Sequence, residues 1–163
     1  MLHLAAQALV KQARALPVDT FATNVMGTAH LLEAVRQEPG VRAVVVVTSD
    51  KVYDNVEWAW GYRESDRLGG KEPYGASKAA CELVVDSYRH AYWHDAGPRI
   101  ATARAGNVIG GGDWAADRLV PDAMRAFSGL APLVVRNPLS TRPWQHVLEP
   151  VAAYCRLAEA LAQ

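Results

Sequence analysis

Cysteine, excess charge and long apolar runs are all scarce in this sequence. The two cysteines, Cys81 and Cys155, form no metal-ligand pattern, so we expect no metal site and a reducing intracellular setting. The 17 basic residues equal the 17 acidic ones, and no basic surplus points to nucleic acid. No apolar run approaches a membrane span, and no basic segment precedes the short apolar start. We therefore expect a cytoplasmic protein with no membrane or nucleic-acid partner.

The remaining composition is that of a globular domain, with 163 residues of which 50% are hydrophobic. Apolar runs typical of strands alternate along the chain with helical patterns. This order predicts an α/β fold, a Rossmann-like parallel sheet with flanking helices that forms an incomplete doubly wound fold. The expected strands cover residues 2–6, 42–48, 100–104 and 133–136, and the expected helices cover residues 19–36, 74–93, 121–128 and 150–162.

The chain is organised around the run from Val44 to Thr48. Its β-branched residues, without a polar break, predict a strand buried on both faces of the sheet. Ser49, Asp50 and Lys51 follow directly. Since ligands of open α/β sheets bind past the carboxyl ends of the strands, these three polar residues are candidates for a catalytic site.

Tyr74 and Lys78 are the second candidate pair. If a helix starts near Tyr74, the two side chains lie one turn apart on the same face. A nearby ammonium favours the phenolate, and a pKa lowered by roughly three units would make Tyr74 a usable base at neutral pH. Ser49 could then hold the substrate hydroxyl. The alternative is an ordinary surface pair, because Tyr-x-x-x-Lys by itself is a weak motif.

Three further segments carry polar side chains in places suited to a ligand. Asn24, inside the first long helix, either faces the crevice or is simply solvated. The glycine-rich segment after Asn107 does not match a phosphate-binding loop, but Asn107 could orient a ligand there. The irregular segment 140–146 brings together Arg142 and His146, which suits an anionic ligand with a flat ring. A surface loop with one core tryptophan is the plain alternative.

Taken together, these motifs resemble the extended short-chain dehydrogenase/reductase family, in its sugar-nucleotide dehydratase branch. The segments that carry the resemblance are His3–Ala6, Thr23–Thr28, Thr48–Tyr53, Tyr74-x-x-x-Lys78 and Arg104–Asn107. Three more segments look like the members that act on CDP-glucose: Gly61–Glu64, Gly106–Trp114 and Arg142–Val147.

The resemblance implies an NAD-dependent hydro-lyase that converts CDP-glucose to CDP-4-keto-6-deoxyglucose. The reaction oxidises C4, eliminates water across C5 and C6, and returns the hydride to C6. Carried over by position, Tyr74, Lys78 and Ser49 would act on the 4-hydroxyl, and Asp50 would protonate the departing 6-hydroxyl. The implied NAD contacts are Ala5, Tyr74 and Lys78, and the implied substrate contacts are Asn107, Arg118, Arg142 and His146.

Lys51 stands where many sugar-nucleotide dehydratases carry a glutamate that removes the C5 proton. Its position and the family's glutamate favour a role for Lys51 as that base in the form of a neutral amine, which requires burial to lower its pKa. As an ammonium, it could only stabilise the enolate oxygen.

The resemblance also implies that residues 1–163 are an internal fragment. No Gly-rich turn for the NAD pyrophosphate precedes His3. Residues 1–163 would then form one partial NAD-binding domain, with residues 133–163 entering the substrate-binding part, and the full-length parent would be a homodimer. Two alternatives stay open. The first is an epimerase or a dehydratase that acts on another sugar nucleotide, and the second is a non-catalytic remnant of the fold.

We predict that a polypeptide of residues 1–163 alone does not bind NAD at micromolar concentration, does not dehydrate CDP-glucose, and tends to self-associate. Without a Gly-rich turn, loss of three charge-assisted hydrogen bonds at about 1.5 kcal/mol each weakens binding by roughly three orders of magnitude. Calorimetry with NAD and size-exclusion chromatography provide the test. A monodisperse monomer that binds NAD tightly contradicts the prediction.

Overall fold

The computed structural model describes residues 1–94 and 96–163. Its main sheet has three parallel strands in the order β1 (Leu2–His3), β2 (Ala43–Val47) and β3 (Arg99–Ala103). The central strand β2 pairs with β1 through Leu2 and His3 and with β3 along all five residues. The predicted parallel α/β sheet is therefore confirmed, with the Val44 run at its centre.

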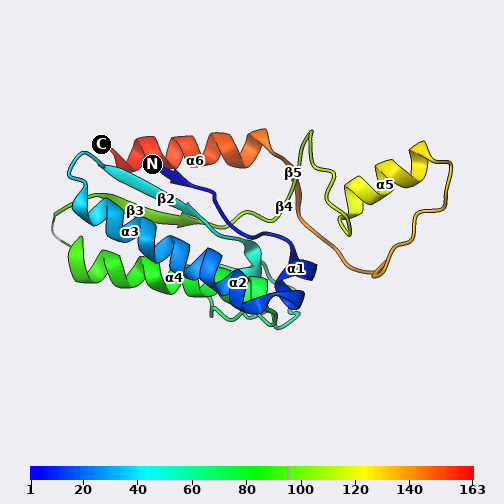
Figure 1. Cartoon of the computed structure of the whole chain (residues 1–163), viewed down its shortest axis with the longest axis horizontal. Coiled ribbons are helices and arrows are strands. Elements are labelled where there is room, and N and C mark those ends of the chain that lie inside the picture. The colour runs from blue at the N-terminus through cyan, green and yellow to red at the C-terminus, as the bar shows by residue number, and fades with distance from the viewer. Residues whose placement is uncertain (95) are drawn as a thin grey trace.

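Helices cover both faces of this sheet (Figure 1). On one face lie α3 (Gly27–Gln37) and α4 (Pro73–Tyr92), and on the other lies α6 (Leu148–Leu161). Because side chains alternate along a strand, Val44 and Val46 point together into the core against α3 and α4, which contains Leu32 and Val85. Among the described residues, no helix is both long and apolar enough to cross a membrane.

The helix predicted for residues 19–36 is divided in the structure. It consists of α2 (Pro17–Phe21), a π-helical turn η1 (Ala22–Met26) and then α3. A short helix α1 (Val10–Ala15), which the sequence did not predict, precedes them. The wider turn changes which residues share a face, and it turns Asn24 inward, as the site shows below.

A second, smaller sheet corrects two sequence predictions. The segment 140–146, expected to be irregular, contains β5 (Trp144–His146), which pairs in parallel with β4 (Asn107–Ile109) at the start of the glycine-rich segment. The strand predicted for residues 133–136 is wrong, since no strand forms there and Val134 is 84% exposed. A short run becomes a strand only where a partner strand supplies hydrogen bonds. Residues 133–136 lie instead near α5 (Leu119–Ser128), far from the main sheet (Figure 1).

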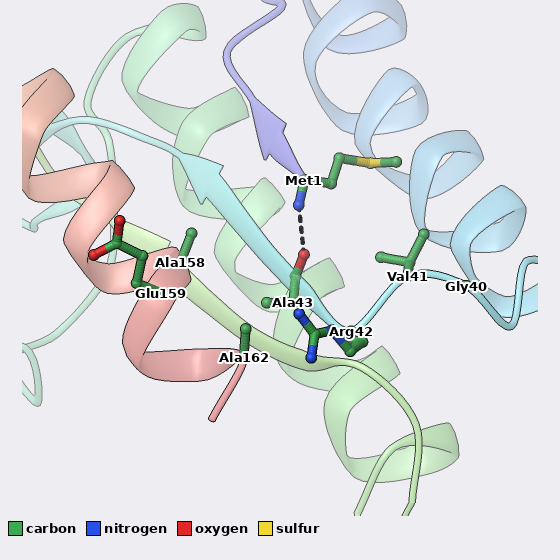
Figure 2. Close-up of a pocket in the computed structure, with 8 residues that line it drawn as sticks. All are labelled: Met1, Gly40, Val41, Arg42, Ala43, Ala158, Glu159 and Ala162. Carbon is green, nitrogen blue, oxygen red and sulfur yellow. Dashed lines mark hydrogen bonds between the residues drawn. The ribbon is translucent and has the colours of Figure 1, made fainter.

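A cavity of about 420 Å³ lies at the amino-terminal end of β2 (Figure 2). Gly40–Ala43 line one side and Ala158, Glu159 and Ala162 of α6 the other, with the Met1 ammonium donating to the Ala43 carbonyl oxygen at 2.6 Å. In parallel α/β sheets, ligands bind at the opposite, carboxyl-terminal ends of the strands. The cavity is therefore not the candidate active site.

Candidate active site

The residues Ser49, Asp50 and Lys51 lie just beyond β2 and begin a short 3₁₀ turn, η2 (Asp50–Val52). The Ser49 hydroxyl donates to Asp50 Oδ1 at 3.1 Å and accepts from the Lys51 backbone N–H at 3.2 Å. The Asp50 backbone N–H donates to the Ala105 carbonyl oxygen at 3.0 Å. The turn is thus fixed by its own hydroxyl and by the chain that follows β3.

Helix α4 begins one residue before Tyr74 because of its cap. The Glu72 carboxylate accepts from the backbone N–H groups of Tyr74 at 2.9 Å and Gly75 at 2.7 Å, and Pro73 occupies the first helical position. Tyr74 is 9% exposed and Lys78 is 6% exposed. The alternative of an ordinary surface pair is therefore wrong.

Close backbone contact brings α4 against the turn η2. A Cβ atom on Gly75 would lie 2.8 Å from the Lys51 carbonyl oxygen, and one on Gly70 would lie 2.1 Å from the Gly75 carbonyl carbon. Both positions therefore need glycine. The two glycines let the first turn of α4 lie directly beside Ser49, Asp50 and Lys51.

Burial dominates the electrostatics of the Tyr74–Lys78 pair. It raises the pKa of Tyr74 above its ordinary value, and a hydrogen bond with Ser49 and the charge of Arg118 offset only part of this increase. Burial also lowers the pKa of Lys78, whose ammonium donates to the Val47 carbonyl oxygen at 3.0 Å. The expectation that Lys78 lowers the pKa of Tyr74 is not met in this chain by itself, because burial is the largest influence on this pKa and Lys78 is not among the groups that shift it.

Asn24 is 1% exposed, so the solvated alternative for this residue is wrong. Its Oδ1 accepts from the Gln7 backbone N–H at 2.8 Å, and its Nδ2 donates to the Gln7 carbonyl oxygen at 3.0 Å and to Ser77 Oγ at 2.8 Å. Ser77 in turn donates to the Tyr74 carbonyl oxygen at 2.7 Å. Asn24 therefore joins the π-helical turn, the segment after β1 and the start of α4.

The other predicted site residues are distributed between two places. Ala5 is exposed just after β1, and Lys51 is exposed in the turn η2. Asn107 and His146 lie in the small sheet, where His146 is opposite Ile109. Two arginines precede later elements: Arg118 lies directly before α5 and donates to Asp113 at 3.0 Å, and Arg142 is exposed before β5. Their roles toward substrate and NAD remain predictions.

The sequence reasoning missed Glu82, a buried carboxylate that is 7% exposed. It accepts four hydrogen bonds from strand ends: Thr48 Oγ1 at 2.6 Å, Thr102 Oγ1 at 2.8 Å, and Arg104 Nε and Nη2 at 2.9 and 2.8 Å. Burial raises the pKa of Glu82, but the hydrogen bonds from Arg104, Thr48 and Thr102 outweigh it and leave this pKa lowered. Its spacing, four residues after Lys78 on the same helical face, is the signal that could have identified it.

The structure is a parallel α/β sheet with buried Tyr74 and Lys78 beside Ser49 at the strand ends, and comparison with known proteins identifies the family. The sequence model of the GDP-mannose 4,6 dehydratase family matches residues 1–162. The chain therefore belongs to this family.

Individual relatives agree with the family. The CDP-glucose 4,6-dehydratase of Salmonella typhimurium is 52% identical over 98% of this chain, which spans 46% of that protein. The solved dTDP-glucose 4,6-dehydratase of Streptomyces venezuelae with NAD bound matches with a TM-score of 0.81 and 29% identity over 99% of this chain and 48% of its own. The UDP-N-acetylglucosamine 4-epimerase of Methanobrevibacter ruminantium matches with a TM-score of 0.84 and 25% identity, over 97% and 50%. The chain thus spans about half the length of these proteins.

We predict that Asn24→Ala destabilises the protein by about 2–4 kcal/mol. The substitution leaves the Gln7 backbone groups and the Ser77 hydroxyl buried without their partner. Urea denaturation followed by circular dichroism measures the change. Asn55→Ala is the matched control, because the Asn55 amide also makes three hydrogen bonds but is exposed. Equal effects of the two substitutions contradict the prediction.

Proposed function

We propose that the protein carrying these residues is an NAD-dependent hydro-lyase that converts CDP-glucose to CDP-4-keto-6-deoxyglucose. The observation that carries the proposal is the buried Tyr74–Lys78 pair beside Ser49, whose hydroxyl is bonded to Asp50. The 52% identity to a CDP-glucose 4,6-dehydratase supports the choice of substrate.

The described residues fit one end of NAD. The Lys78 ammonium has three N–H donors, and within the described part of the chain it uses one of them, toward Val47. Its remaining donors suit ribose hydroxyls, with Tyr74 beside them and Ala5 at the end of β1. NAD, when bound, supplies the acceptor and later the donor of the hydride and, when oxidised, a positive charge that lowers the pKa of Tyr74.

Each residue near the turn η2 has one role in this proposal. Tyr74 removes the proton of the 4-hydroxyl, which Ser49 orients, as C4 becomes a ketone that acidifies the C5 proton. Asp50 protonates the 6-hydroxyl as water leaves. Lys51, next to Asp50 in the turn η2, removes the C5 proton as a neutral amine once bound substrate covers it, and it returns that proton to C5 as the hydride reaches C6.

We assign substrate binding to the second group of residues. Asn107 and His146 share the small sheet, and Arg118 lies close enough to Tyr74 to influence its pKa. With the exposed Arg142, these side chains present cations and an amide suited to a nucleoside diphosphate. Residues 133–163 then enter the substrate-binding part, although α6 itself packs on the main sheet.

We also propose that the full-length protein is a cytoplasmic homodimer. The family resemblance supports the dimer, and two free cysteines, Cys81 and Cys155, support a reducing compartment. Light scattering that gives the mass of a single chain rules out the dimer, and recovery of the protein in a secreted fraction rules out the location.

Product analysis tests the reaction class. With CDP-glucose deuterated at C4, we expect a product lighter by one water, with the deuterium at C6. An epimer of unchanged mass instead identifies an epimerase, a reaction for which Asp50 has no leaving hydroxyl to protonate. Competition between CDP-, dTDP- and UDP-glucose tests the nucleotide, and a higher kcat/KM for another nucleotide corrects the substrate.

Tyr74→Phe should lower kcat by about 10²–10⁴-fold, because the substitution removes the proton acceptor and keeps the ring. Tyr92→Phe, on the same helix and 56% exposed, is the matched control and should retain wild-type kcat. Steady-state kinetics at saturating substrate provide the measurement. A Tyr74→Phe enzyme within about tenfold of wild type excludes Tyr74 as the base.

A further inference from the structure

The guanidinium of Arg104, directly after β3, contacts three parts of the fold. Its Nε and Nη2 donate to the two carboxylate oxygens of Glu82 on α4 at 2.9 and 2.8 Å. Its Nη1 donates to the Glu64 carbonyl oxygen at 3.1 Å. Its flat face lies over the ring of Tyr53, with Cζ 4.9 Å from the ring centroid. One side chain therefore links α4, the end of β3 and the segment that follows η2.

The Glu82 end of this contact fixes the strand ends next to the candidate catalytic residues. Thr48, the residue before Ser49, donates to Glu82 at 2.6 Å. Ala105, the residue after Arg104, accepts from the Asp50 backbone N–H. Since Tyr74 and Glu82 belong to the same helix, the ion pair sets the distance between the turn that carries Ser49 and Asp50 and the helix that carries Tyr74.

On its other side, the Arg104 guanidinium contacts residues 53–64 through Tyr53, and we call these residues the aromatic loop. Tyr53 stacks on Tyr62 with ring centroids 4.9 Å apart, and Trp58 lies 5.2 Å from the Tyr62 ring. The Tyr62 hydroxyl donates to Asn55 Oδ1 at 2.8 Å. Through Tyr53 and the Glu64 carbonyl, Arg104 contacts the aromatic loop at both its ends.

Only arginine suits this position. The side chain of Arg104 is 14% exposed and that of Glu82 is 6% exposed, so the charges must be paired. A planar fork can bind both carboxylate oxygens while its face stacks on an aromatic ring, and a lysine ammonium cannot do both.

We propose that Arg104 is a positioning residue. It holds Ser49 and Asp50 at their distance from Tyr74, and it keeps the aromatic loop folded beside them. The statement about the loop stands on the contacts alone, whereas the statement about the catalytic residues rests on the proposed function.

Limited proteolysis tests the loop without any substrate. Trypsin cleavage at the exposed Arg63 and Arg67, identified by mass spectrometry, should be about tenfold faster in Arg104→Lys, the change expected from loss of roughly one net hydrogen bond. The substitution preserves the number of trypsin sites. Arg36→Lys is the matched control, because Arg36 makes the same fork to Glu33 at 2.9 and 2.6 Å and lies over the Tyr92 ring, but is 42% exposed.

Each result decides the proposal for the loop. Faster cleavage in Arg104→Lys with unchanged cleavage in Arg36→Lys supports it, and equal rates in the two variants overturn it. If Arg104→Lys is cleaved throughout the chain, Tyr53→Leu decides instead, because this variant keeps the buried ion pair and removes only the ring. Faster cleavage at Arg63 and Arg67 in Tyr53→Leu supports the proposal, and wild-type cleavage overturns it.

Kinetics test the catalytic residues. Arg104→Lys should lower kcat by about 10- to 100-fold with KM within about twofold, because displaced groups slow the reaction without changing substrate contacts. An unchanged kcat, or a change in KM alone, overturns the positioning of Ser49 and Asp50. These kinetics use the full-length protein, so an inactive full-length wild type contradicts the proposed function instead, and the proteolysis result for the loop still stands.

Discussion

The buried carboxylate of Glu82 is the interaction on which the active-site end of the fold depends. It accepts hydrogen bonds from side chains at the ends of β2 and β3, so that the ends of both strands are held at a fixed position relative to α4. Removing one partner of such a buried pair typically costs roughly 3–5 kcal/mol, because the other charge is left uncompensated. The carboxylate is therefore a constraint on geometry more than a source of net stability.

Burial of the side chains on α4 also disfavours the charged forms of Tyr74 and Lys78. Tyr74 and Lys78 are both removed from water, and each is pushed toward its neutral form: the pKa of Tyr74 is raised and that of Lys78 is lowered. A site of this kind gains its base only when a positively charged group binds beside the phenol. Under the proposed function, base catalysis is coupled to NAD binding, which limits proton removal in the absence of the cofactor.

Membership of the family and the geometry of the candidate site each limit the set of reactions to be considered. The fold is shared by dehydratases and epimerases among the solved structures, so it cannot by itself choose between these reactions. Under the proposed function, Asp50, which is hydrogen-bonded to Ser49 and Ala105, supplies the proton that a dehydration needs and an epimerisation does not. The likeness in sequence to a CDP-glucose enzyme then supports one nucleotide among several.

The sequence by itself determined the features that depend on local pattern. The run of valines before Ser49 predicted a buried parallel strand, and the pattern after the polar loop predicted a helix from about Tyr74, one residue after α4 begins. Both follow from side-chain periodicity and capping, which short stretches of sequence encode fully.

Only the tertiary structure decided the rest. The π-helical turn that buries Asn24 and the pairing of β4 with β5 depend on partners far along the chain. The hydrogen bonds that Glu82 and Arg104 make at the strand ends also join distant segments. Residues 133–136 have the composition of a strand but lack a partner strand, so they form none. The pKa of Tyr74 differed from expectation for a similar reason: spacing shows which charge is near, but only packing shows how much water remains.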